Sequence, residues 1–386
     1  MQHPWYRPLF ACLLVSCLLF SCLLSACSTM APPVERIPGQ PRVIGYVSDA
    51  EVLPPVSAGK LDVINFAFAH VTPGNEVVLV KPTAARSLRK LTALRKRNPS
   101  LRILLSIGGW GAGNFSEAAL DDASRARFAR SAVALLARHR LDGLDIDWEY
   151  PTQPGPGISH RPEDRQNFTL LLHAVRSELD ALPPSKRGRY LLTIAAADGE
   201  AASGLELAQI AHVLDWINLM TYDFHGSLSP TTGHQTGLYR SASAPEDSRN
   251  SEQAVEEFLA AGVPAAKLHL GLAFYGRRFA DVVPDNNGLY QRFGSDGGYV
   301  SWQRIQGDYL DKGGFVRHWD AQAQAAWLWN AAERRLISYD DPQALRAKAA
   351  FVRQRGLGGV MYWEHSNDPE EQLLDVVRAA LLAPGE

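Results

Sequence analysis

The sequence has 386 residues, of which 46% are hydrophobic and 21% are charged. This composition is ordinary for a globular protein, and it supplies enough apolar residues for one large folded domain. The formal net charge is −2, and no run of Lys and Arg is long enough to suggest a nucleic-acid-binding segment. We therefore expect no nucleic-acid partner and an uncharged substrate.

The first 26 residues have the pattern of an export signal. Arg7 precedes an apolar run from Leu9 to Leu24, and small residues follow it. The motif Leu-Ser-Ala-Cys at 24–27 resembles the cleavage box of bacterial lipoproteins, in which the cysteine becomes the lipidated first residue of the mature protein. The sequence thus predicts an exported protein that is lipid-anchored through Cys27 to a bacterial membrane, on its periplasmic or cell-surface side. The alternative is an uncleaved membrane anchor, because the apolar run is almost long enough to span a bilayer.

The segment after Cys27 predicts a tether. Residues 28–41 contain four prolines among polar residues and lack periodicity, which is typical of an extended linker. All four cysteines lie within the first 27 residues, so a lipidated Cys27 leaves no thiol for disulfides, cysteine catalysis or zinc–thiolate sites. We divide the chain into a signal peptide at 1–26, the lipidated cysteine with its tether at 27–41, and one domain at 42–382.

Short β-branched segments alternate with helical patterns eight times along this domain. Eight strand–helix units in about 340 residues predict an α/β fold, the TIM (β/α)8 barrel, rather than an open doubly wound sheet. An open sheet would also require a glycine-rich phosphate loop after its first strand, and residues 45–49 offer none. The expected strands are Arg42–Tyr46, Val63–Ala69, Arg102–Ile107, Gly143–Glu149, Tyr190–Ala196, Trp216–Tyr222, Leu268–Phe274 and Gly359–Trp363.

The longest gap between expected strands separates the seventh from the eighth. Within it, residues 276–338 are rich in Gly, aromatic residues and short alternating patterns. They predict a small α+β insertion between strand 7 and helix 7, which would form one wall of a groove at the carboxyl end of the barrel. A helical pattern at 369–382 closes the barrel, and we expect a monomer.

The most informative segment is Asp-Gly-Leu-Asp-Ile-Asp-Trp-Glu at 142–149. Asp145, Asp147 and Glu149 occupy alternate positions, so on a strand they would share one face. A solvated strand edge could also carry such acids. However, the preceding residues 124–141 have an amphipathic helix pattern, which indicates a helix-covered strand whose carboxyl end collects the chemistry. Because charged residues are almost never fully buried without a partner, the pattern predicts a proton-handling site.

Further motifs stand at the ends of other expected strands. They are Ser-Ile-Gly-Gly at 106–109, Met-Thr-Tyr-Asp at 220–223, Tyr-Gly-Arg at 275–277 and Gly-Gly-Val-Met-Tyr-Trp at 358–363. Together with the acidic segment, and in this order, they resemble the motifs of glycoside hydrolase family 18, the chitinases. The resemblance implies hydrolysis of β-1,4 N-acetylglucosamine linkages in chitin or chitooligosaccharides, with no cofactor and no metal. It also implies substrate-assisted retaining catalysis, in which the sugar's own acetamide oxygen attacks.

The resemblance assigns separate roles to four residues. Glu149 would be the general acid/base, and it must hold a proton near working pH. Asp147 would accept the acetamide N–H and orient it, while Asp145 would share a proton or a hydrogen bond beneath it. Tyr222 would donate a hydrogen bond to the acetamide oxygen.

The same resemblance suggests the residues that line the reacting sugar. Trp363 would form the apolar floor beneath it, with a purely structural tryptophan as the alternative. Met220 and Asp223 after strand six, and Tyr275 and Arg277 after strand seven, would line the same subsite. Packing or internal ion pairing is the alternative for these four.

Aromatic platforms for neighbouring sugars are only partly present. Tyr46 and Trp110 match family positions that stack on the non-reducing side, whereas Leu228 and Ala50 stand where the family often has tryptophan. These departures favour shorter or soluble chains over crystalline chitin. We expect Ser106 and the two glycines after it to allow a close approach of strands rather than to contact substrate.

Two other functions stay open. One is an endo-N-acetylglucosaminidase that acts on glycoprotein or cell-wall glycan, an alternative that tethering at a cell surface keeps open. The other is a chitin-binding lectin, because the fold survives loss of the acid as a binding protein. The presence of Glu149, Asp147 and Tyr222 argues against the lectin.

Overall fold

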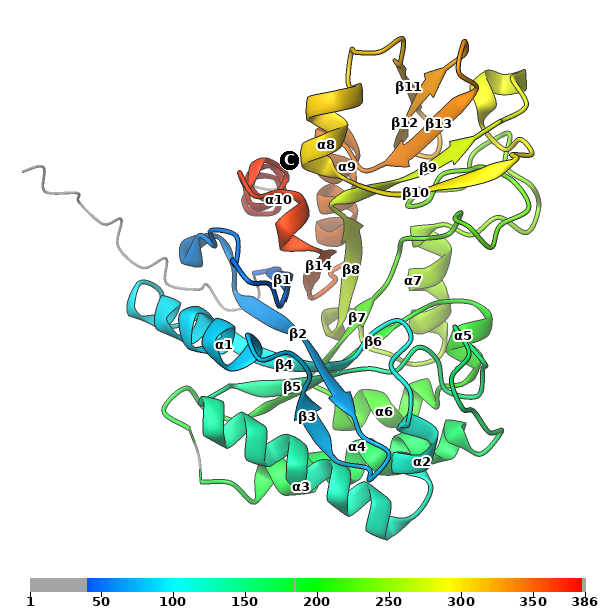
Figure 1. The fold of residues 1–386 in the computed structure, drawn as a ribbon. Coiled ribbons are helices and arrows are strands. Elements are labelled where there is room, and N and C mark those ends of the chain that lie inside the picture. Colours follow the sequence, from blue (N-terminus) through cyan, green and yellow to red (C-terminus); the bar gives the residue numbers. More distant parts are fainter. Residues whose placement is uncertain (1–39, 184, 384–386) are drawn as a thin grey trace, which may run out of the picture. The chain divides into compact units, whose positions relative to one another are not determined.

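The computed structural model describes residues 40–183 and 185–383 (Figure 1). Within them, eight parallel strands follow one another in the order β1-β14-β8-β7-β6-β5-β4-β2, and β1 pairs with β2 to close the barrel. The prediction of a TIM (β/α)8 barrel is confirmed. The expected export signal, Cys27 and most of the tether lie outside the described residues. The barrel strands are β1 (Arg42–Ser48), β2 (Val63–Val71), β4 (Arg102–Gly108), β5 (Gly143–Asp147), β6 (Leu191–Ala196), β7 (Trp216–Leu219), β8 (Leu268–Ala273) and β14 (Gly359–Trp363).

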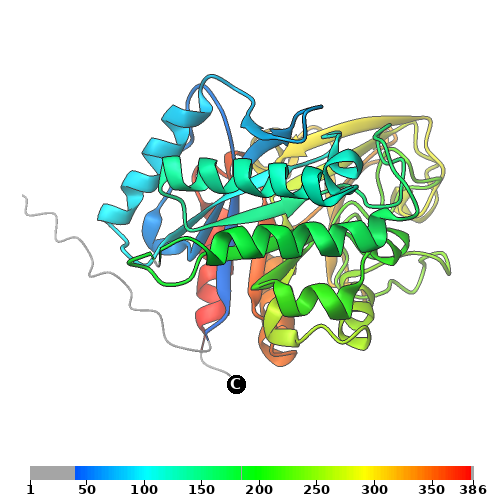
Figure 2. The same cartoon turned by 90° about the horizontal axis from the view of Figure 1, so that it is seen from below.

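Helices cover the outside of this barrel, and Figure 2 shows α3 and α4 side by side across it. Capping explains the boundaries of α3. At its start, the Asp121 side chain accepts a 2.8 Å hydrogen bond from the N–H of Ser124, and at its end Arg140 adopts the left-handed conformation. No described helix is both long and apolar enough to cross a membrane. The helices are α1 (Ala84–Ala93), α2 (Phe115–Ala119), α3 (Asp122–His139), α4 (Asp164–Asp180), α5 (Glu200–Ser203), α6 (Leu207–Val213), α7 (Ser251–Ala260), α8 (Trp302–Arg304), α9 (Pro342–Gln354) and α10 (Gln372–Leu382).

A second, antiparallel sheet interrupts the barrel between its seventh strand and the next helix, where the sequence predicts an insertion. Only Phe274 separates β8 from β9, so the seventh barrel strand continues directly into this sheet, whose order is β10-β9-β13-β12-β11. The start of β9 therefore lies at the carboxyl end of the barrel. A short strand, β3 (Val77–Leu79), pairs with β2 at the other side of the barrel sheet. The strands of the second sheet are β9 (Tyr275–Ala280), β10 (Ser295–Ser301), β11 (Val316–Asp320), β12 (Ala325–Asn330) and β13 (Arg335–Tyr339).

Alternation along β5 separates two apolar layers. Leu144 and Ile146 belong to the large core between strands and helices. Trp148 joins them and lies between Phe115 and Phe168, with ring centroids 5.4 Å away in both cases. Burial of one such aromatic side chain contributes roughly 2–3 kcal/mol. A separate, smaller apolar cluster occupies the barrel interior, so the acids between these residues face inward.

A buried ion pair fastens the second sheet to the barrel. Lys348 of α9 is fully buried, and its Nζ lies 2.7 Å from Oδ1 of Asp340 and 2.6 Å from Oγ1 of Thr236. Asp340 also accepts a hydrogen bond of 3.2 Å from the N–H of Ala273, the last residue of β8. The pair thus joins the chain leaving β13, the helix α9 and the seventh barrel strand.

Candidate active site

Three acids follow one another along β5, from the barrel interior toward its carboxyl end. Asp145 and Asp147 are buried within the strand, and Glu149 is partly buried two residues beyond Asp147. Gly108 of β4 permits this arrangement because a Cβ there would lie 2.0 Å from the backbone oxygen of Asp147. The N–H of Gly109 instead donates a 2.9 Å hydrogen bond to that oxygen. The two glycines therefore let the third strand approach the acidic one closely.

Asp145 is held by four hydrogen-bond donors from four other strands. They are the hydroxyl of Tyr46 at 2.9 Å, Oγ of Ser106 at 2.8 Å, Oγ1 of Thr193 at 2.5 Å and Nδ2 of Asn218 at 3.1 Å. Burial raises the pKa of Asp145, and these hydrogen bonds oppose the rise by stabilising the carboxylate. The carboxylate is thus fixed at the base of the site.

Asp147, unlike Asp145, has a carboxylate oxygen without a hydrogen-bond donor among the described residues. Its Oδ1 is buried and has no hydrogen-bond partner among the described residues. Burial, followed by the negative charges of Glu149 and Asp145, raises the pKa of Asp147 well above its ordinary value. An unpaired buried acceptor is costly, so this oxygen is suited to an external N–H donor or to a proton.

Glu149 can hold a proton near neutral pH. Burial raises its pKa from 4.5 to about 7, a hydrogen bond with Tyr150 opposes the shift, and the charge of Asp223 adds to it. A carboxylic acid with this pKa at the mouth of a barrel strand is poised for general acid–base chemistry.

Tyr222 lies just beyond the carboxyl end of β7, beside the acids. Its hydroxyl contacts Sδ of Met361 at 3.8 Å, a weak interaction that leaves the O–H available as a donor. Burial and the charges of Asp147 and Glu149 raise the pKa of Tyr222 well above 10, so the phenol stays protonated. Met220 and Tyr222 both belong to the interior cluster of the barrel.

Trp363 closes the other side of this interior cluster, at the end of β14. Its ring stacks on Phe68 with centroids 5.6 Å apart and an interplanar angle of 19°, and it lies 5.8 Å from the ring of Tyr46. Phe68 thus holds the tryptophan ring from one side. A half-buried ring fixed in this way can offer its free edge and face to a sugar.

Asp223 and Arg277 form a bidentate ion pair across the site. Nε and one Nη of Arg277 each lie 2.7 Å from a carboxylate oxygen of Asp223. The guanidinium also lies over the ring of Tyr275, 5.7 Å from its centroid, and Tyr275 stacks on Tyr299 at 4.6 Å. The sequence left two interpretations for Asp223 and Arg277, which were contact with the sugar and internal ion pairing. Their geometry is that of an internal ion pair, and the charge of Asp223 also raises the pKa of Glu149.

No group of three or more His, Cys, Asp and Glu side chains in the described part of the chain could hold a metal ion. A profile of the glycosyl hydrolases family 18 matches residues 42–368. The chain belongs to glycosyl hydrolase family 18.

Relatives in family 18 agree with this assignment. Chitinase A1 of Niallia circulans is 40% identical over 317 residues, which are 78% of this chain and 45% of that protein. Chitinase 1 of Aphanocladium album is 38% identical over 289 residues, which are 72% of this chain and 64% of that protein. The chain thus spans less than two thirds of the length of these relatives.

A solved structure extends the likeness to three dimensions. The family 18 N-acetylglucosaminidase from Paenibacillus barengoltzii is 40% identical, with a TM-score of 0.83 over 88% of this chain and 99% of that chain. The family resemblance of the motifs is therefore confirmed.

The structure contradicts the stacking role that the family resemblance implied for Tyr46. Tyr46 was expected to stack on a sugar, but it is only 2% exposed and its hydroxyl points at Asp145. A ring buried inside the barrel cannot offer its face to substrate. Trp110, in contrast, is 58% exposed and lies edge-on to Tyr150 with centroids 6.2 Å apart, so its ring is accessible.

The sequence analysis did not predict the hydrogen-bond donors that surround the carboxylate of Asp145. Ser106 was expected only to relieve crowding, yet it donates directly to that carboxylate, as do Thr193 and Asn218. A signal was present, because Thr193 and Asn218 are polar residues within the otherwise apolar strands Leu191–Ala196 and Trp216–Leu219. Phe68 gave no comparable signal.

Proposed function

We propose that this family 18 enzyme is a chitinase, which hydrolyses β-1,4 N-acetylglucosamine linkages in chitin or chitooligosaccharides with Glu149 as general acid/base. The observation that carries the proposal is the pair formed by a protonatable Glu149 and an Asp147 whose Oδ1 has no partner among the described residues. The names of the two chitinases at 38–40% identity support the substrate.

The first step breaks the bond between the anomeric carbon and the glycosidic oxygen. Glu149 donates its proton to that oxygen, and the acetamide oxygen of the same sugar forms the new bond to the anomeric carbon. Asp147 accepts the acetamide N–H through its free oxygen, while Tyr222 donates its O–H to the acetamide oxygen. Both contacts orient the internal nucleophile for attack.

The second step restores the enzyme. Glu149, now a carboxylate, removes a proton from water, and the water oxygen attacks the anomeric carbon as the acetamide leaves. Two displacements at one carbon give overall retention of configuration. Trp363 supports the reacting sugar, Asp145 fixes the position beneath Asp147, and Trp110 stacks on a more distant sugar.

A second candidate keeps the same chemistry but changes the substrate. The solved neighbour at 40% identity is named an N-acetylglucosaminidase. An enzyme that cleaves N-acetylglucosamine linkages in short oligosaccharides, glycoprotein or cell-wall glycan would use the same acids. The exposed Leu228 and the expected lack of two tryptophan platforms fit short substrates.

The test is a timed digest of N-acetylglucosamine hexamer by wild type, Glu149→Gln and the control Glu163→Gln, whose residue is exposed. We expect early β-anomeric dimers and trimers from wild type and from the control. Turnover by Glu149→Gln should be slower than that of wild type by roughly 10²-fold or more. Monomers alone would favour an N-acetylglucosaminidase that acts on short oligosaccharides. Hexamer binding without cleavage by any form would instead favour a lectin or an enzyme directed at glycoprotein or cell-wall glycan.

We further propose that the protein is exported as a monomer and lipid-anchored through Cys27 to a bacterial membrane. The basis is the sequence alone, namely the apolar run followed by Leu-Ser-Ala-Cys at 24–27. Cys27→Ala should release active protein from the membrane fraction. Continued retention of that variant in membranes would favour an uncleaved anchor.

A further inference from the structure

Basic residues that are scattered in the sequence come together at one end of the barrel. They lie within and just after α1, at the end of α3 and in the loop before β6, which are the segments that precede the neighbouring strands β4, β5 and β6. Because these strands are parallel and in register, the three segments meet at the amino-terminal end of the barrel. We name as the basic end the exposed residues Arg89, Lys96, Arg97, Arg138, Arg140 and Lys186.

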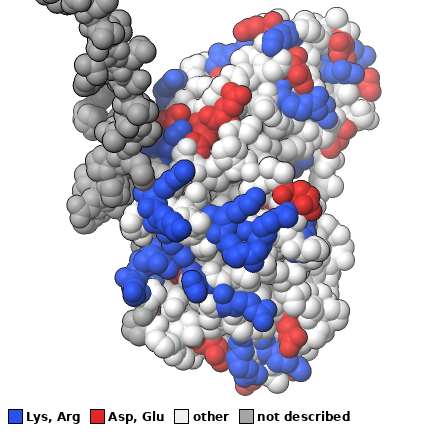
Figure 3. Space-filling model, turned by 60° about the vertical axis from the view of Figure 1, so that its left-hand side comes forward, with Lys and Arg blue, Asp and Glu red and all other residues white. Residues whose placement is uncertain are grey.

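These side chains are not neutralised. None of the six has an ion-pair or side-chain hydrogen-bond partner in the part of the chain that the structure describes. Beside them, Asp142 alone faces the three guanidinium groups of Arg95, Arg102 and Arg187, so that cluster is also net positive. Figure 3 shows Lys and Arg gathered over this side of the domain. A chain with a net charge of −2 therefore has one strongly positive face.

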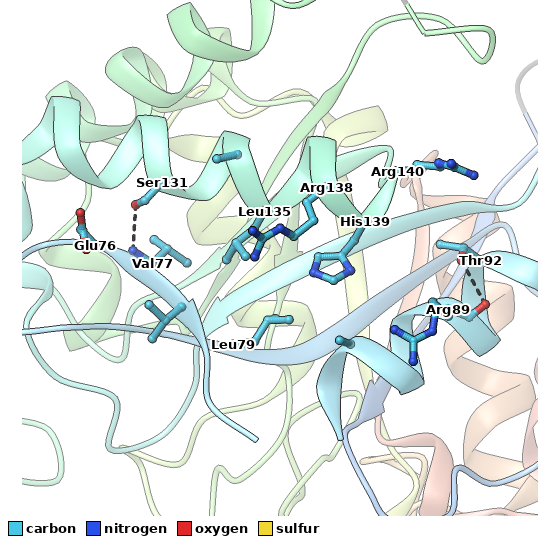
Figure 4. A pocket seen from close by; sticks show the side chains of 13 residues that line it. Glu76, Val77, Leu79, Arg89, Thr92, Ser131, Leu135, Arg138, His139 and Arg140 are labelled. Carbon is cyan, nitrogen blue, oxygen red and sulfur yellow. Dashed lines mark hydrogen bonds between the residues drawn. The ribbon is translucent and has the colours of Figure 1, made fainter. Parts of the chain in front are cut away.

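A hollow of about 1160 Å³ runs along the flank of the barrel between β3, α1 and α3, and one end of it, at Arg138 and Arg140, lies within the basic end. Leu79 and Leu135 give it an apolar floor, Arg89, Arg138 and Arg140 stand around it, and Glu76 lies at the end away from Arg140 (Figure 4). The three arginines outweigh this one carboxylate, so the end at Arg138 and Arg140 suits an anionic group.

The electrostatic environment of the hollow supports an anionic occupant. His139 lies in its lining, and burial together with the charges of Arg138 and Arg89 lowers the pKa of that imidazole. A second positive charge is therefore disfavoured there, whereas an anion would be attracted.

The position of the basic end points to the kind of anion. The described chain enters β1 at Arg42, at this same end, while the catalytic acids stand at the opposite, carboxyl end of β5. A flat anionic surface bound here would leave the active site facing away from it.

We propose that the basic end is a docking surface for an anionic phospholipid membrane. It would hold the enzyme on the lipid surface with its active site outward, and Arg138 and Arg140 at one end of the hollow would contact the phosphate of a phospholipid headgroup. Each cation near the surface strengthens such binding, and salt weakens it. The proposal does not depend on the lipid at Cys27 or on the identity of the substrate.

The experiment uses residues 33–386, the unit that contains the entire barrel, with sedimentation of two kinds of vesicle. Vesicles of phosphatidylcholine alone are compared with vesicles containing about 30% phosphatidylglycerol, at about 0.1 M and 0.5 M NaCl. The triple variant Lys96→Gln/Arg138→Gln/Arg140→Gln tests the surface. The control Arg292→Gln/Arg304→Gln/Lys312→Gln removes the same formal charge from exposed residues of the second sheet region.

We expect salt-sensitive binding to the phosphatidylglycerol vesicles only, at least about tenfold weaker for the first triple variant and unchanged within about twofold for the control. Turnover of soluble hexamer should be the same for both variants. Equal binding to both kinds of vesicle, equal loss in both variants, or binding of heparin or DNA without binding of vesicles would each overturn the proposal.

Discussion

The hydroxyl of Tyr46 donates a 2.9 Å hydrogen bond to Oδ2 of Asp145, across the barrel and 99 positions along the chain. Ser106 donates to the same oxygen at 2.8 Å. These contacts come from β1 and β4, so the first and third barrel strands both fix the innermost acid of the fourth. The arrangement of the barrel strands therefore also fixes the position of the acidic row, which consists of Asp145, Asp147 and Glu149.

Tyr46→Phe should reduce turnover by roughly tenfold, because Asp145 loses one donor to its charged form, a contact of about 1.5 kcal/mol. The matched control is Tyr362→Phe, which loses a hydrogen bond of 2.9 Å to His365 outside the acidic row. Both variants should lose about 1 kcal/mol of unfolding free energy in urea. Equal turnover of the two variants would contradict a positioning role for Tyr46.

Asp223→Asn should move the alkaline limb of the pH–rate profile to lower pH. The charge of Asp223 raises the pKa of Glu149, which is about 7, so its removal lowers that pKa. A general acid works only while protonated, and activity is then lost earlier as pH rises. Asparagine tolerates the left-handed backbone found here, with φ 60°. The control Asp308→Asn breaks an exposed ion pair with Arg304 and should leave the profile unchanged.

Two tryptophans near the site should respond differently to replacement by alanine. Trp110→Ala should raise KM for the hexamer severalfold with unfolding free energy unchanged, since the ring is 58% exposed. Trp148→Ala should lower the unfolding free energy by about 3–5 kcal/mol, because its ring fills the core between Phe115 and Phe168. Urea titrations and steady-state kinetics of both variants check this. A large stability loss in Trp110→Ala would contradict its assignment.

Lys348→Met should lower the unfolding free energy by about 3–5 kcal/mol, because Asp340 then remains buried without its cation. Lys348→Met/Asp340→Leu should recover most of this loss, since an apolar pair replaces an ionic one. Denaturant titrations of the two variants test the coupling. No recovery in the double variant would mean that the hydrogen bonds of Asp340 to Ala273 and Thr236, rather than its charge, hold this junction.

Local patterns in the sequence were sufficient to predict the barrel and its acidic strand. The eight strands have short β-branched segments. Asp145, Asp147 and Glu149 alternate with Leu144, Ile146 and Trp148, and this two-residue alternation matches the two faces of β5 in the structure. The insertion was detectable because its composition changes after the seventh strand.

Contacts between distant strands could not be predicted in the same way. The burial of Tyr46 depends on its phenol reaching Asp145, and nothing adjacent to Tyr46 in sequence indicates that partner. Phe68 and the basic end are similar cases. The stacking of Phe68 on Trp363, and the gathering of cations from three separate segments of the chain, exist only once the barrel closes.

The central claim is that Glu149 protonates the departing oxygen. It is tested most directly by comparing wild type and Glu149→Gln on the hexamer and on a dinitrophenyl chitobioside, whose phenolate leaves without protonation. We predict a loss of roughly 10²-fold or more on the hexamer and a far smaller loss in the initial release of dinitrophenol. An equal loss on both substrates, or wild-type turnover of the hexamer, would contradict the claim.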